Sequence, residues 1–556
     1  MYFRLCFAFA IICSAAFLQP LKANADVKTV TPADDIQKAV NGLAAGDTLY
    51  FSEGIYTRKT ALYFKKLKGT EDAPIVVGPA PGAHAVIKLD STYTKFVLAD
   101  WDHNNIHVQK CHYLEIFGFE ITAGRTGIEA EFVNSHCTFR DLHIHHVGNV
   151  GIRIASGSSH HMKCLGNHIH HTYMHGEGYY IGDNDGRSKI NNTIFEGNYI
   201  HDTSILNDQG DGVELKRMTW GNHVRYNVIH SVHYPGVIVW GTGRKDPKYN
   251  NKVYGNLIFN ARAGEAGMQV SSEVDIFNNI IINDGNGKMY SALHTIENLH
   301  SGEPMNHVRI YNNTFFGVEK GVGLMSWEGK EGMVFANNAI YCPKETDEAI
   351  ITDAAKLDNA IIEGNRYFGT VTGDGLKKYI GKGLQKSEAA GSVFVNPDGE
   401  MSSIDLTLLP GSSLVDAAQG EWIAESDFMQ QARLDDASAD VGALELNGRG
   451  QFKAVFGNTF GLKITTFGGK AFDLSEKPAN LAYSVPAGNK GAVSVAIYDT
   501  RGRLIKILAD GVVDSGIHKL TWNGLDELGG IVSKGVYFVR LDTASGEHLR
   551  RIMILN

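Results

Sequence analysis

The sequence predicts an all-β protein, in which a long parallel coil of short strands is followed by a small antiparallel β-sandwich. Three observations support this prediction. Gly is abundant, at 62 of 556 residues, and Pro is scarce, at 13, which favours many short strands joined by tight turns. One apolar pattern repeats through the centre of the chain at intervals of 23 to 34 residues. Residues 475–556 alternate between apolar and polar with period two.

The first 25 residues have the layout of a cleavable secretory signal. Arg4 precedes an apolar run, and small residues end the segment before Asp26. This run is shorter than the about 20 apolar residues that a membrane span needs, which argues against the alternative of a membrane anchor. We therefore expect a mature chain that begins near Asp26, has no membrane span, and is secreted or held at the cell surface after passing the periplasm.

Each repeat is centred on an apolar anchor, and the variable interval fits a coil of fixed short strands separated by turns of variable length. The anchors are Ile121, Ile144, Ile169, Ile200, Ile229, Ile258, Ile281, Phe315, Ile340 and Tyr367. From Ile169 onward the residue two before the anchor is always Asn, which tolerates left-handed backbone geometry and hydrogen-bonds locally. We therefore predict a stacked amide ladder, formed by Asn167, Asn198, Asn227, Asn256, Asn279, Asn313, Asn338 and Asn365.

With this ladder, the chain resembles the right-handed parallel β-helix proteins of the pectate-lyase superfamily. Its segment "DIQKAVNGLAAGDTLYFSEGIYT" is similar to the cap helix and first coils of several polysaccharide lyase families, and "ADVGALEL" near residue 440 is similar to their closing segment. The tail resembles an Ig-like module of flagellar-hook-cap type and, at its end, the sorting domains of a bacterial secretion system. The expected domains are a signal peptide 1–25, a right-handed parallel β-helix with an N-terminal cap 26–445, a linker 446–474, and an Ig-like β-sandwich 475–556 that serves as spacer or contacts secretion machinery.

A second short strand in each repeat opens with Gly, as in "EGYYIGD" and "DGVELKR". Aligning the inward residues of these strands, Tyr179 and Val213 among them, places Glu177 and Asp211 at equivalent positions of adjacent coils. Equivalent positions of a parallel coil stand about 4.8 Å apart. Two carboxylates that close need a cation, a basic partner or a shared proton.

Further acidic residues surround this pair in the sequence. Several oxygen donors on adjoining turns suit a hard cation such as calcium, which takes six to eight oxygens. The alternative is a solvated acidic loop without a metal. The expected calcium ligands are Glu177, Asp183, Asp185, Asp208 and Asp211.

Lys216 points outward on the same face as Glu214 and is expected beside Trp240. It either forms a surface ion pair or, with its pKa depressed by nearby cations, takes the proton from carbon 5 of a uronate, which is β-elimination. "DGVELK" is similar to the strand that carries the Lys of some calcium-dependent lyase families, displaced by two positions from Glu214. The candidate catalytic residues are Lys216, Arg153, Glu214, His175 and His233.

Cationic and aromatic side chains near this face are candidates for binding a sugar chain. Arg and Lys grip uronate carboxylates, and aromatic faces stack on sugars, although the aromatics equally suit edge filling between coils. The candidates are Tyr180, Arg217, Tyr234, Trp240, Arg244 and Lys245.

Histidines follow the anchor in four consecutive coils, at His145, His170, His201 and His230. A file of imidazoles can bind a transition metal or act as a base. The alternative is a structural stack, because N-x-I-H is a turn element that recurs across β-helices.

The function that fits these features is an exported polysaccharide lyase that acts on a uronate-containing chain, an acidic polysaccharide. One alternative is an inverting glycoside hydrolase that uses Glu177, Asp211 and Glu214, and another is a non-catalytic glycan-binding or adhesion protein. The net charge of −9 argues against non-specific nucleic-acid binding, and we expect a monomer. The cysteines of the mature chain are expected to be small buried hydrophobes or to form one disulfide: Cys111, Cys137, Cys164 and Cys342.

Overall fold

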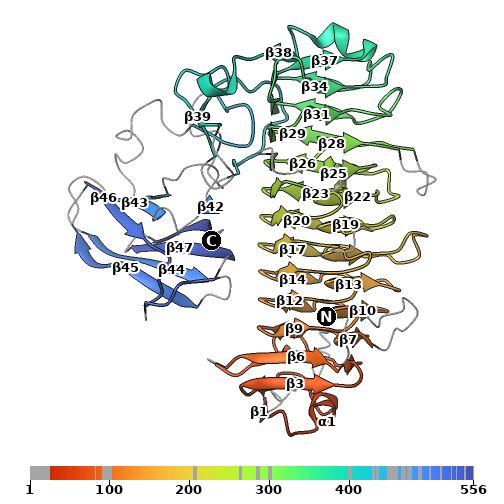
Figure 1. The fold of residues 1–556 in the computed structure, drawn as a ribbon, viewed down its shortest axis with the longest axis vertical. Helices are drawn as coiled ribbons and strands as arrows, with labels where there is room; N and C mark the ends of the chain where they lie inside the picture. Colours follow the sequence, from red (N-terminus) through yellow and green to blue (C-terminus); the bar gives the residue numbers. More distant parts are fainter. Residues whose placement is uncertain are drawn as a thin grey trace, which may run out of the picture.

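The protein is a right-handed parallel β-helix with small, mostly antiparallel sheets at its C-terminal end (Figure 1). The computed structural model describes residues 25–81, 83–90, 103–204, 209–261, 266–283, 289–297, 304–398, 404–428, 433, 438–446 and, with gaps, 461–554. The expected signal peptide lies outside the described residues, except for Ala25. Within the described part, no helix has both the length and the apolar character needed to span a bilayer.

Each coil contributes one strand to each of three parallel sheets, which run along the long axis (Figure 1). Among the described residues, sheet 1 has 13 strands: β1 (Val27–Val30), β2 (Thr48–Phe51), β5 (Ile75–Pro79), β8 (Leu114–Phe117), β11 (Thr138–Arg140), β14 (Lys163–Leu165), β17 (Ile194–Glu196), β20 (His223–Arg225), β23 (Asn251–Tyr254), β26 (Val274–Phe277), β29 (Val308–Tyr311), β32 (Val334–Ala336) and β35 (Ile361–Glu363).

Sheet 2 carries the Gly-opened strands. In the described part of the chain it has 12 strands: β4 (Leu62–Lys65), β7 (Ile106–Gln109), β10 (Ile128–Glu131), β13 (Ile152–Ala155), β16 (Tyr179–Ile181), β19 (Val213–Leu215), β22 (Val237–Val239), β25 (Ala266–Val270), β28 (Ser291–Thr295), β31 (Lys320–Gly323), β34 (Glu348–Ile351) and β37 (Thr370–Thr372).

Sheet 3 carries the anchors. It has 13 described strands: β3 (Gly54–Arg58), β6 (Ala85–Leu89), β9 (Glu120–Thr122), β12 (His143–His145), β15 (His168–His170), β18 (Tyr199–His201), β21 (Val228–His230), β24 (Leu257–Phe259), β27 (Ile280–Ile282), β30 (Thr314–Phe316), β33 (Ala339–Tyr341), β36 (Asn365–Phe368) and β38 (Leu384–Lys386).

The strand register confirms the predicted alignment of the repeats. Ile144 pairs with Ile169 in sheet 3, and Tyr179 pairs with Val213 in sheet 2. All four side chains point inward and are fully buried. Because burial of an aliphatic or aromatic side chain stabilises a fold by about 1.5–3 kcal/mol, this continuous apolar interior specifies the register of every coil.

The asparagine ladder is also confirmed. Asn198 donates from its backbone N to Asn227 Oδ1 at 2.9 Å and from Nδ2 to the same oxygen at 2.8 Å, and Asn227 repeats this pattern on Asn256 at 3.0 and 2.9 Å. A second, shorter ladder was not predicted: Asn222 donates to Asn251 Oδ1 from N and Nδ2, both at 3.1 Å. A ladder of only two Asn residues does not produce a repeat that can be recognised in the sequence.

The N-terminal end of the helix is capped as expected. Helix α1 (Ile36–Asn41) begins after Asp35, whose side chain accepts a hydrogen bond from Lys38 N at 3.0 Å and so satisfies one free amide of the first turn. Ile36 and Val40 are buried, so the apolar stripe of the helix closes the end of the core. The short 3-10 helices are η3 (Pro247–Tyr249), η4 (Asp374–Tyr379) and η5 (Ala390–Ser392).

After the last coil, the chain returns along the outside of sheet 3. An antiparallel pair, β39 (Phe394–Asn396) and β40 (Asp405–Leu408), contributes to an apolar cluster on that outer face. Phe394 and Leu406 pack there with Phe259 and Tyr341. The predicted closing segment takes part through Val441 and its neighbours.

The tail forms two small sheets. The expected linker 446–474 contains two strands of these sheets, because β41 pairs with β43 and β42 pairs with β48. These strands are too short to give a recognisable alternation in the sequence. The Ig-like and sorting identities of this tail stay predictions. The strands are β41 (Gly461–Ile464), β43 (Ala479–Val485) and β46 (Gly516–Trp522) in one sheet, and β42 (Ala471–Phe472), β48 (Gly546–Ile554), β47 (Gly535–Thr543), β44 (Gly491–Asp499) and β45 (Leu504–Val513) in the other.

The cysteines of the described chain are buried free thiols, as expected for small hydrophobes, and no disulfide joins them. They are Cys111, Cys137, Cys164 and Cys342.

Removing one rung of the ladder tests its contribution to stability. Asn227→Ala deletes an acceptor for Asn198 and the 3.0 Å hydrogen bond from Asn227 Nδ2 to Phe195 O. Leaving buried polar groups unpaired costs about 1–3 kcal/mol each, so the free energy of unfolding should fall by about 2–4 kcal/mol in denaturant titrations. The surface variant Asn191→Ala should change it by less than about 0.5 kcal/mol, and equal losses in both variants would contradict the ladder's role.

Candidate functional site

The two Gly-flanked carboxylates lie in adjacent coils, in the turns that lead into β16 and β19. Gly178 N donates to Asp211 O at 2.8 Å, so the two turns are in direct backbone contact. A Cβ at Gly178 would lie 2.6 Å from Gly212 O, and one at Gly212 would lie 2.4 Å from Gly236 O. Only Gly fits such an approach, which explains why each carboxylate is followed by Gly.

Glu214, which points outward from β19, completes a group of three carboxylates with Glu177 and Asp211. One oxygen of each residue lies within 4.8 Å of those of the other two, and the three residues are only 1 to 3% exposed. Three buried oxygens find no hydrogen-bond donor among the described residues: Glu177 Oε2, Asp211 Oδ1 and Glu214 Oε2. Burying anionic oxygens without partners is costly, so this group needs a proton or a cation.

The cost of burying these carboxylates also raises the pKa values of Glu177 and Asp211. Burial, with repulsion from Glu214, raises the pKa of Glu177 to about 7. Burial also raises the pKa of Asp211 well above its ordinary value, with repulsion from Glu214 and Glu177 as further causes. Without a cation, Glu177 and Asp211 therefore retain protons at pH values where exposed carboxylates lose them.

Lys216 lies beside the group. Its Nζ is 2.5 Å from Glu214 Oε1, and Trp240 Nε1 donates to the same oxygen at 2.7 Å. The ammonium also lies 4.6 Å from the ring centroid of Tyr180 and 5.7 Å from that of Trp240. The predicted neighbourhood of Lys216, Glu214 and Trp240 is therefore present.

Without a cation the pKa of Lys216 is raised, whereas the depressed pKa was expected beside bound cations and stays a prediction. Burial lowers this pKa, but the charge of Glu214 and its hydrogen bond, with Tyr180 and Asp211, outweigh burial, so the pKa is raised. The sequence placed the Lys among carboxylates but did not show that one of them contacts it directly. In this state Lys216 is an ammonium.

Arg153 lies one coil before Tyr180 on the outward face of sheet 2, and Tyr180 in turn pairs with Glu214. The Arg153 guanidinium ion-pairs with Glu129 and lies 5.4 Å from the Tyr180 ring centroid. Glu129 was not predicted as a site residue, although the alternation in "TGIEAEF" indicates that its side chain points outward. Burial raises the pKa of Glu129 despite the opposing charge of Arg153.

Two further predicted calcium ligands have other partners. Asp183 accepts a hydrogen bond from Ser188 N at 2.9 Å, and Asp185 forms a surface ion pair with Arg187 at 2.8 Å. Asp208 lies outside the described residues. The structure thus brings together Glu177 and Asp211, with Glu214 in addition, while Asp183 and Asp185 belong to a neighbouring turn.

The predicted histidines and Tyr234 lie in turns that enter sheet 2. His175 and His233 are half-buried and precede β16 and β22. His233 N donates to Thr203 Oγ1 at 3.3 Å, and its ring centroid is 6.0 Å from that of Tyr234. Among the described residues, neither histidine belongs to a group of side chains that could hold a metal ion.

A shallow pocket adjoins Lys216. Its volume is about 230 Å³, open solvent included, and two predicted substrate-binding residues, Arg217 and Trp240, line it. Arg244 is held in a stack, with its guanidinium 3.8 Å from the Trp220 ring centroid, and Lys245 is exposed. The remaining lining residues are Met218, Gly241, Gly243, Ser272 and Glu273.

The residues present fit a hard cation. The three orphaned oxygens of Glu177, Asp211 and Glu214 are anionic donors of the kind that calcium prefers, and their mutual repulsion is what a divalent cation would relieve. Three protein ligands are fewer than the six to eight oxygens that calcium takes, so coordination positions would remain for water or a bound molecule.

Comparison with known proteins agrees with the fold. The family model described as "Pel9A-like, right handed beta helix region" matches residues 19–256, a segment that contains the three carboxylates and Lys216. Pectate lyase PEL9 of Emericella nidulans is 24% identical over 247 residues, which are 42% of this chain and 58% of the fungal protein. The chain therefore spans less than two thirds of that relative.

Solved β-helix structures are similar at low identity. Pectate lyase Pel9A has a TM-score of 0.45 at 16% identity and covers 76% of this chain and 97% of its own. The PL6 family alginate lyase AlyGC has a TM-score of 0.42 at 14% identity, with 67% and 54% covered. GH136 lacto-N-biosidase from Eubacterium ramulus has a TM-score of 0.41 at 14% identity, with 63% and 67% covered.

The raised pKa of Glu177 predicts a pH dependence of stability in chelator. Between its ordinary value of 4.5 and about 7, the folded protein binds more protons than the unfolded chain, so stability falls as the pH rises through this window. Glu177→Gln removes the ionisation and should make the metal-free protein more stable than wild type by roughly 2–3 kcal/mol at pH 8.

Thermal unfolding from pH 4.5 to 8, with chelator, measures this difference. The exposed control Glu319→Gln should follow the wild-type profile. A Glu177→Gln profile parallel to wild type would show that Glu177 ionises normally in the folded protein.

Proposed function

We propose that this protein is an exported polysaccharide lyase that cleaves a uronate-containing chain by β-elimination, with Lys216 as the base. The observation that carries the proposal is the position of the Lys216 ammonium, buried and 2.5 Å from Glu214, at the edge of three carboxylates with unpaired oxygens. Removing the proton from carbon 5 of a uronate requires a base, and a nearby cation that neutralises the uronate carboxylate makes this proton easier to remove. Lys216 beside a group of carboxylates that suits a cation meets both requirements. The similarity to a pectate lyase supports the substrate class.

Lys216 must lose its proton before it can accept another from carbon 5. In the metal-free protein, Glu214 holds this proton on Nζ. When the Glu214 carboxylate is engaged by another partner, the ammonium loses that favourable contact while burial still disfavours its charge, so the pKa of Lys216 falls. Glu214 is therefore the residue that sets the charge state of the base.

Glu177, Asp211 and Glu214 would hold calcium in the proposed active state. When bound, the ion would neutralise the substrate carboxylate and so acidify the proton on carbon 5. This leaves the chain's own residues to carry out proton transfer.

In the elimination, the C5–H bond breaks toward Lys216 Nζ, a double bond forms between C4 and C5, and the C4–O bond to the leaving sugar breaks. The leaving oxygen needs a proton or a positive charge. Arg153, in file with Tyr180 and Glu214, and the turn histidines His175 and His233 are the candidates for that role. Arg217 and Trp240, which line the adjoining pocket, are the candidates for binding neighbouring sugar units.

The spacing of the carboxylates favours a lyase over an inverting hydrolase. Inverting glycosidases separate their two carboxyl groups by about 6.5–9.5 Å to leave room for a water. Here one oxygen of each of Glu177, Asp211 and Glu214 lies within 4.8 Å of those of the other two, which suits shared binding of one cation better.

Replacing the proposed base tests the mechanism. Lys216→Met should lower kcat on the cleaved polysaccharide by about 10²–10⁴-fold, the usual contribution of a general base, with a smaller change in KM. Ultraviolet absorbance of the unsaturated product, measured on pectate, alginate and glycosaminoglycans, reports the rate. Lys163→Met, on the exposed side of sheet 1, is the matched control. New reducing ends without unsaturated product would favour the hydrolase, and glycan binding with no cleavage would favour a binding protein.

Removing the cation should abolish activity, and added calcium should restore it. Asp211→Asn removes one anionic ligand and should raise the calcium concentration for half-maximal activity by tenfold or more, a loss of about 1.4 kcal/mol in binding. The exposed carboxylate variant Asp374→Asn should keep the wild-type requirement. Full activity in chelator would contradict a calcium-dependent mechanism.

A further inference from the structure

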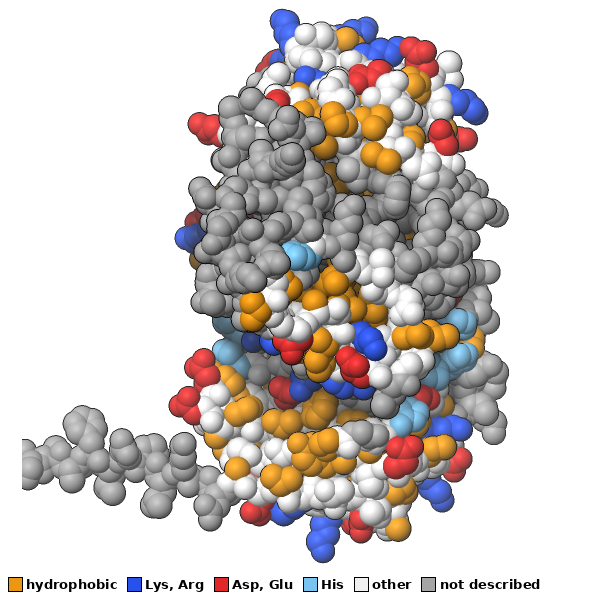
Figure 2. Space-filling view, turned by 90° about the vertical axis from the view of Figure 1, so that its left-hand side faces the viewer, with side chains coloured by type: hydrophobic (Ala, Val, Ile, Leu, Met, Phe, Trp, Pro, Cys, Tyr) orange, Lys and Arg blue, Asp and Glu red, His pale blue; other side chains and the backbone are white. Residues whose placement is uncertain are grey.

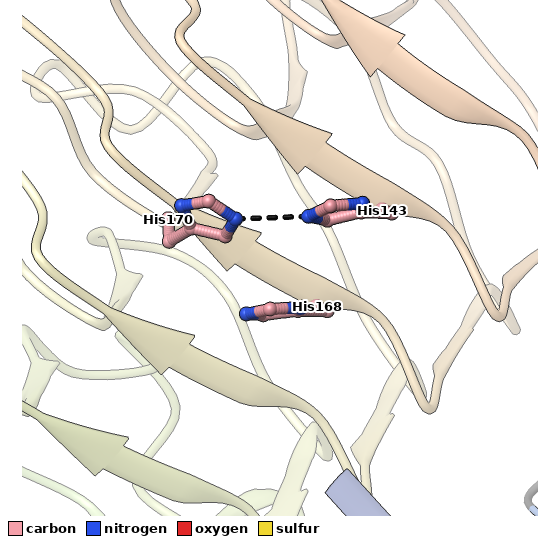
Figure 3. A group of neighbouring side chains, drawn as sticks. All are labelled: His143, His168 and His170. Carbon is pink, nitrogen blue, oxygen red and sulfur yellow. Dashed lines mark hydrogen bonds between the residues drawn. The ribbon is translucent and has the colours of Figure 1, made fainter. Parts of the chain in front are cut away.

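Sheet 3 carries a second group of metal-ligating side chains, separate from the carboxylates of sheet 2. His143 on β12 and His168 on β15 are strand partners, and His170 follows on the same strand as His168. One ring nitrogen of each lies within 4.8 Å of those of the other two. Figure 3 shows His143 and His170 pointing toward each other, with His168 beside them. The three residues come from only two adjacent coils.

We propose that His143, His168 and His170 form a binding site for a divalent transition-metal cation of the zinc type. Three imidazoles with one position left open are a common zinc ligand set. Imidazole nitrogen selects zinc and its neighbours over calcium, which prefers oxygen. This site is therefore chemically distinct from the carboxylate site and does not rest on the proposed lyase activity.

The His143–His170 pair requires little movement to accept a metal, while His168 would have to exchange its 2.8 Å contact with His201 Nε2 for the metal. His143 Nε2 and His170 Nε2 are 2.8 Å apart in the metal-free structure. Tetrahedral zinc with Zn–N bonds of about 2.0–2.1 Å holds its nitrogens about 3.3 Å apart. Opening this pair by about half an ångström replaces one hydrogen bond by two metal bonds, and the strand pairing keeps the two coils in register meanwhile.

The imidazoles are neutral enough to act as ligands. A hydrogen bond between two imidazole nitrogens needs one unprotonated acceptor, so at least one ring of the His143–His170 pair is neutral, and the same holds for His168 and His201, joined at 2.8 Å.

Outer groups contact one ligand ring, that of His170, and the rings of His201 and His145 beside the group. His201 Nδ1 contacts Asp202 Oδ2 at 2.7 Å, and His170 Nδ1 contacts His171 Nδ1 at 2.6 Å. Glu120 adds an acidic group at the same edge, with Oε1 3.2 Å from His145 Nε2. Such outer contacts orient ligand rings and strengthen metal sites. The ligand rings themselves are only half-buried, and Figure 2 shows histidine side chains on the molecular surface near mid-height.

Binding of zinc to the full-length, untagged protein tests the site. Isothermal titration with zinc chloride, after chelator treatment and with calcium present, should show one equivalent bound with a Kd in the micromolar range or below. Zinc should also raise the thermal unfolding midpoint, because a cation bound only to the folded state stabilises it. His143→Gln and His170→Gln should each weaken binding by at least about tenfold.

The chain supplies a matched control. His160 and His161 form a similar nitrogen–nitrogen contact at 2.9 Å but belong to no group of three ligands among the described residues. His160→Gln should therefore bind zinc as wild type does. If the His143 and His170 variants fold poorly, the cobalt(II) spectrum of the wild-type protein should show tetrahedral nitrogen coordination. No zinc binding by wild type, equal binding by all variants, or a cobalt spectrum without imidazole ligands would overturn the proposal.

Discussion

The spacing of the parallel ladder, about 4.8 Å from coil to coil, is the constraint on which both candidate sites depend. It places equivalent side chains of successive coils in contact, whatever their chemistry. Apolar equivalents such as Ile144 and Ile169 gain from this contact. Carboxylates at equivalent positions, Glu177 and Asp211, are forced together at an electrostatic cost, and imidazoles on the outer face of sheet 3 are forced to share protons.

Such a cost needs a scaffold that does not rearrange to avoid it. The asparagine ladder supplies one, because each rung, as at Asn198 and Asn227, satisfies backbone and side-chain donors of one coil with a single oxygen of the next. The turns before β16 and β19 are also fixed, since Gly178 and Gly212 approach neighbouring carbonyls too closely to shift. Because the backbone of these turns is fixed, the carboxylates start close together, and a proton, an ammonium or a cation relieves their repulsion.

Features that arise from periodicity were predictable from the sequence, whereas features that depend on side-chain direction were not. The anchors, the ladder from Asn167 to Asn365 and the adjacency of Glu177 and Asp211 are consequences of register, which a repeat pattern reveals. The third carboxylate of the group, Glu214, was assigned a catalytic role and not a ligand role, because its distance to Asp211 depends on how a side chain turns off the strand. Asp183 and Asp185 were grouped by nearness in sequence, yet each is held within its own turn by Ser188 and Arg187.

The sign of the Lys216 shift shows why pairwise geometry decides the chemistry of this site. Burial alone would make Lys216 a ready base, and the same burial raises the pKa values of Glu177 and Asp211. The direct contact of Lys216 with Glu214 reverses the effect for the ammonium only. A divalent cation held by Glu177, Asp211 and Glu214 would compete with the protons that burial favours on Glu177 and Asp211. It would also withdraw Glu214 from Lys216. In the proposed mechanism, cation binding and activation of the base would therefore be one coupled equilibrium, in which the contact between Lys216 and Glu214 links the two.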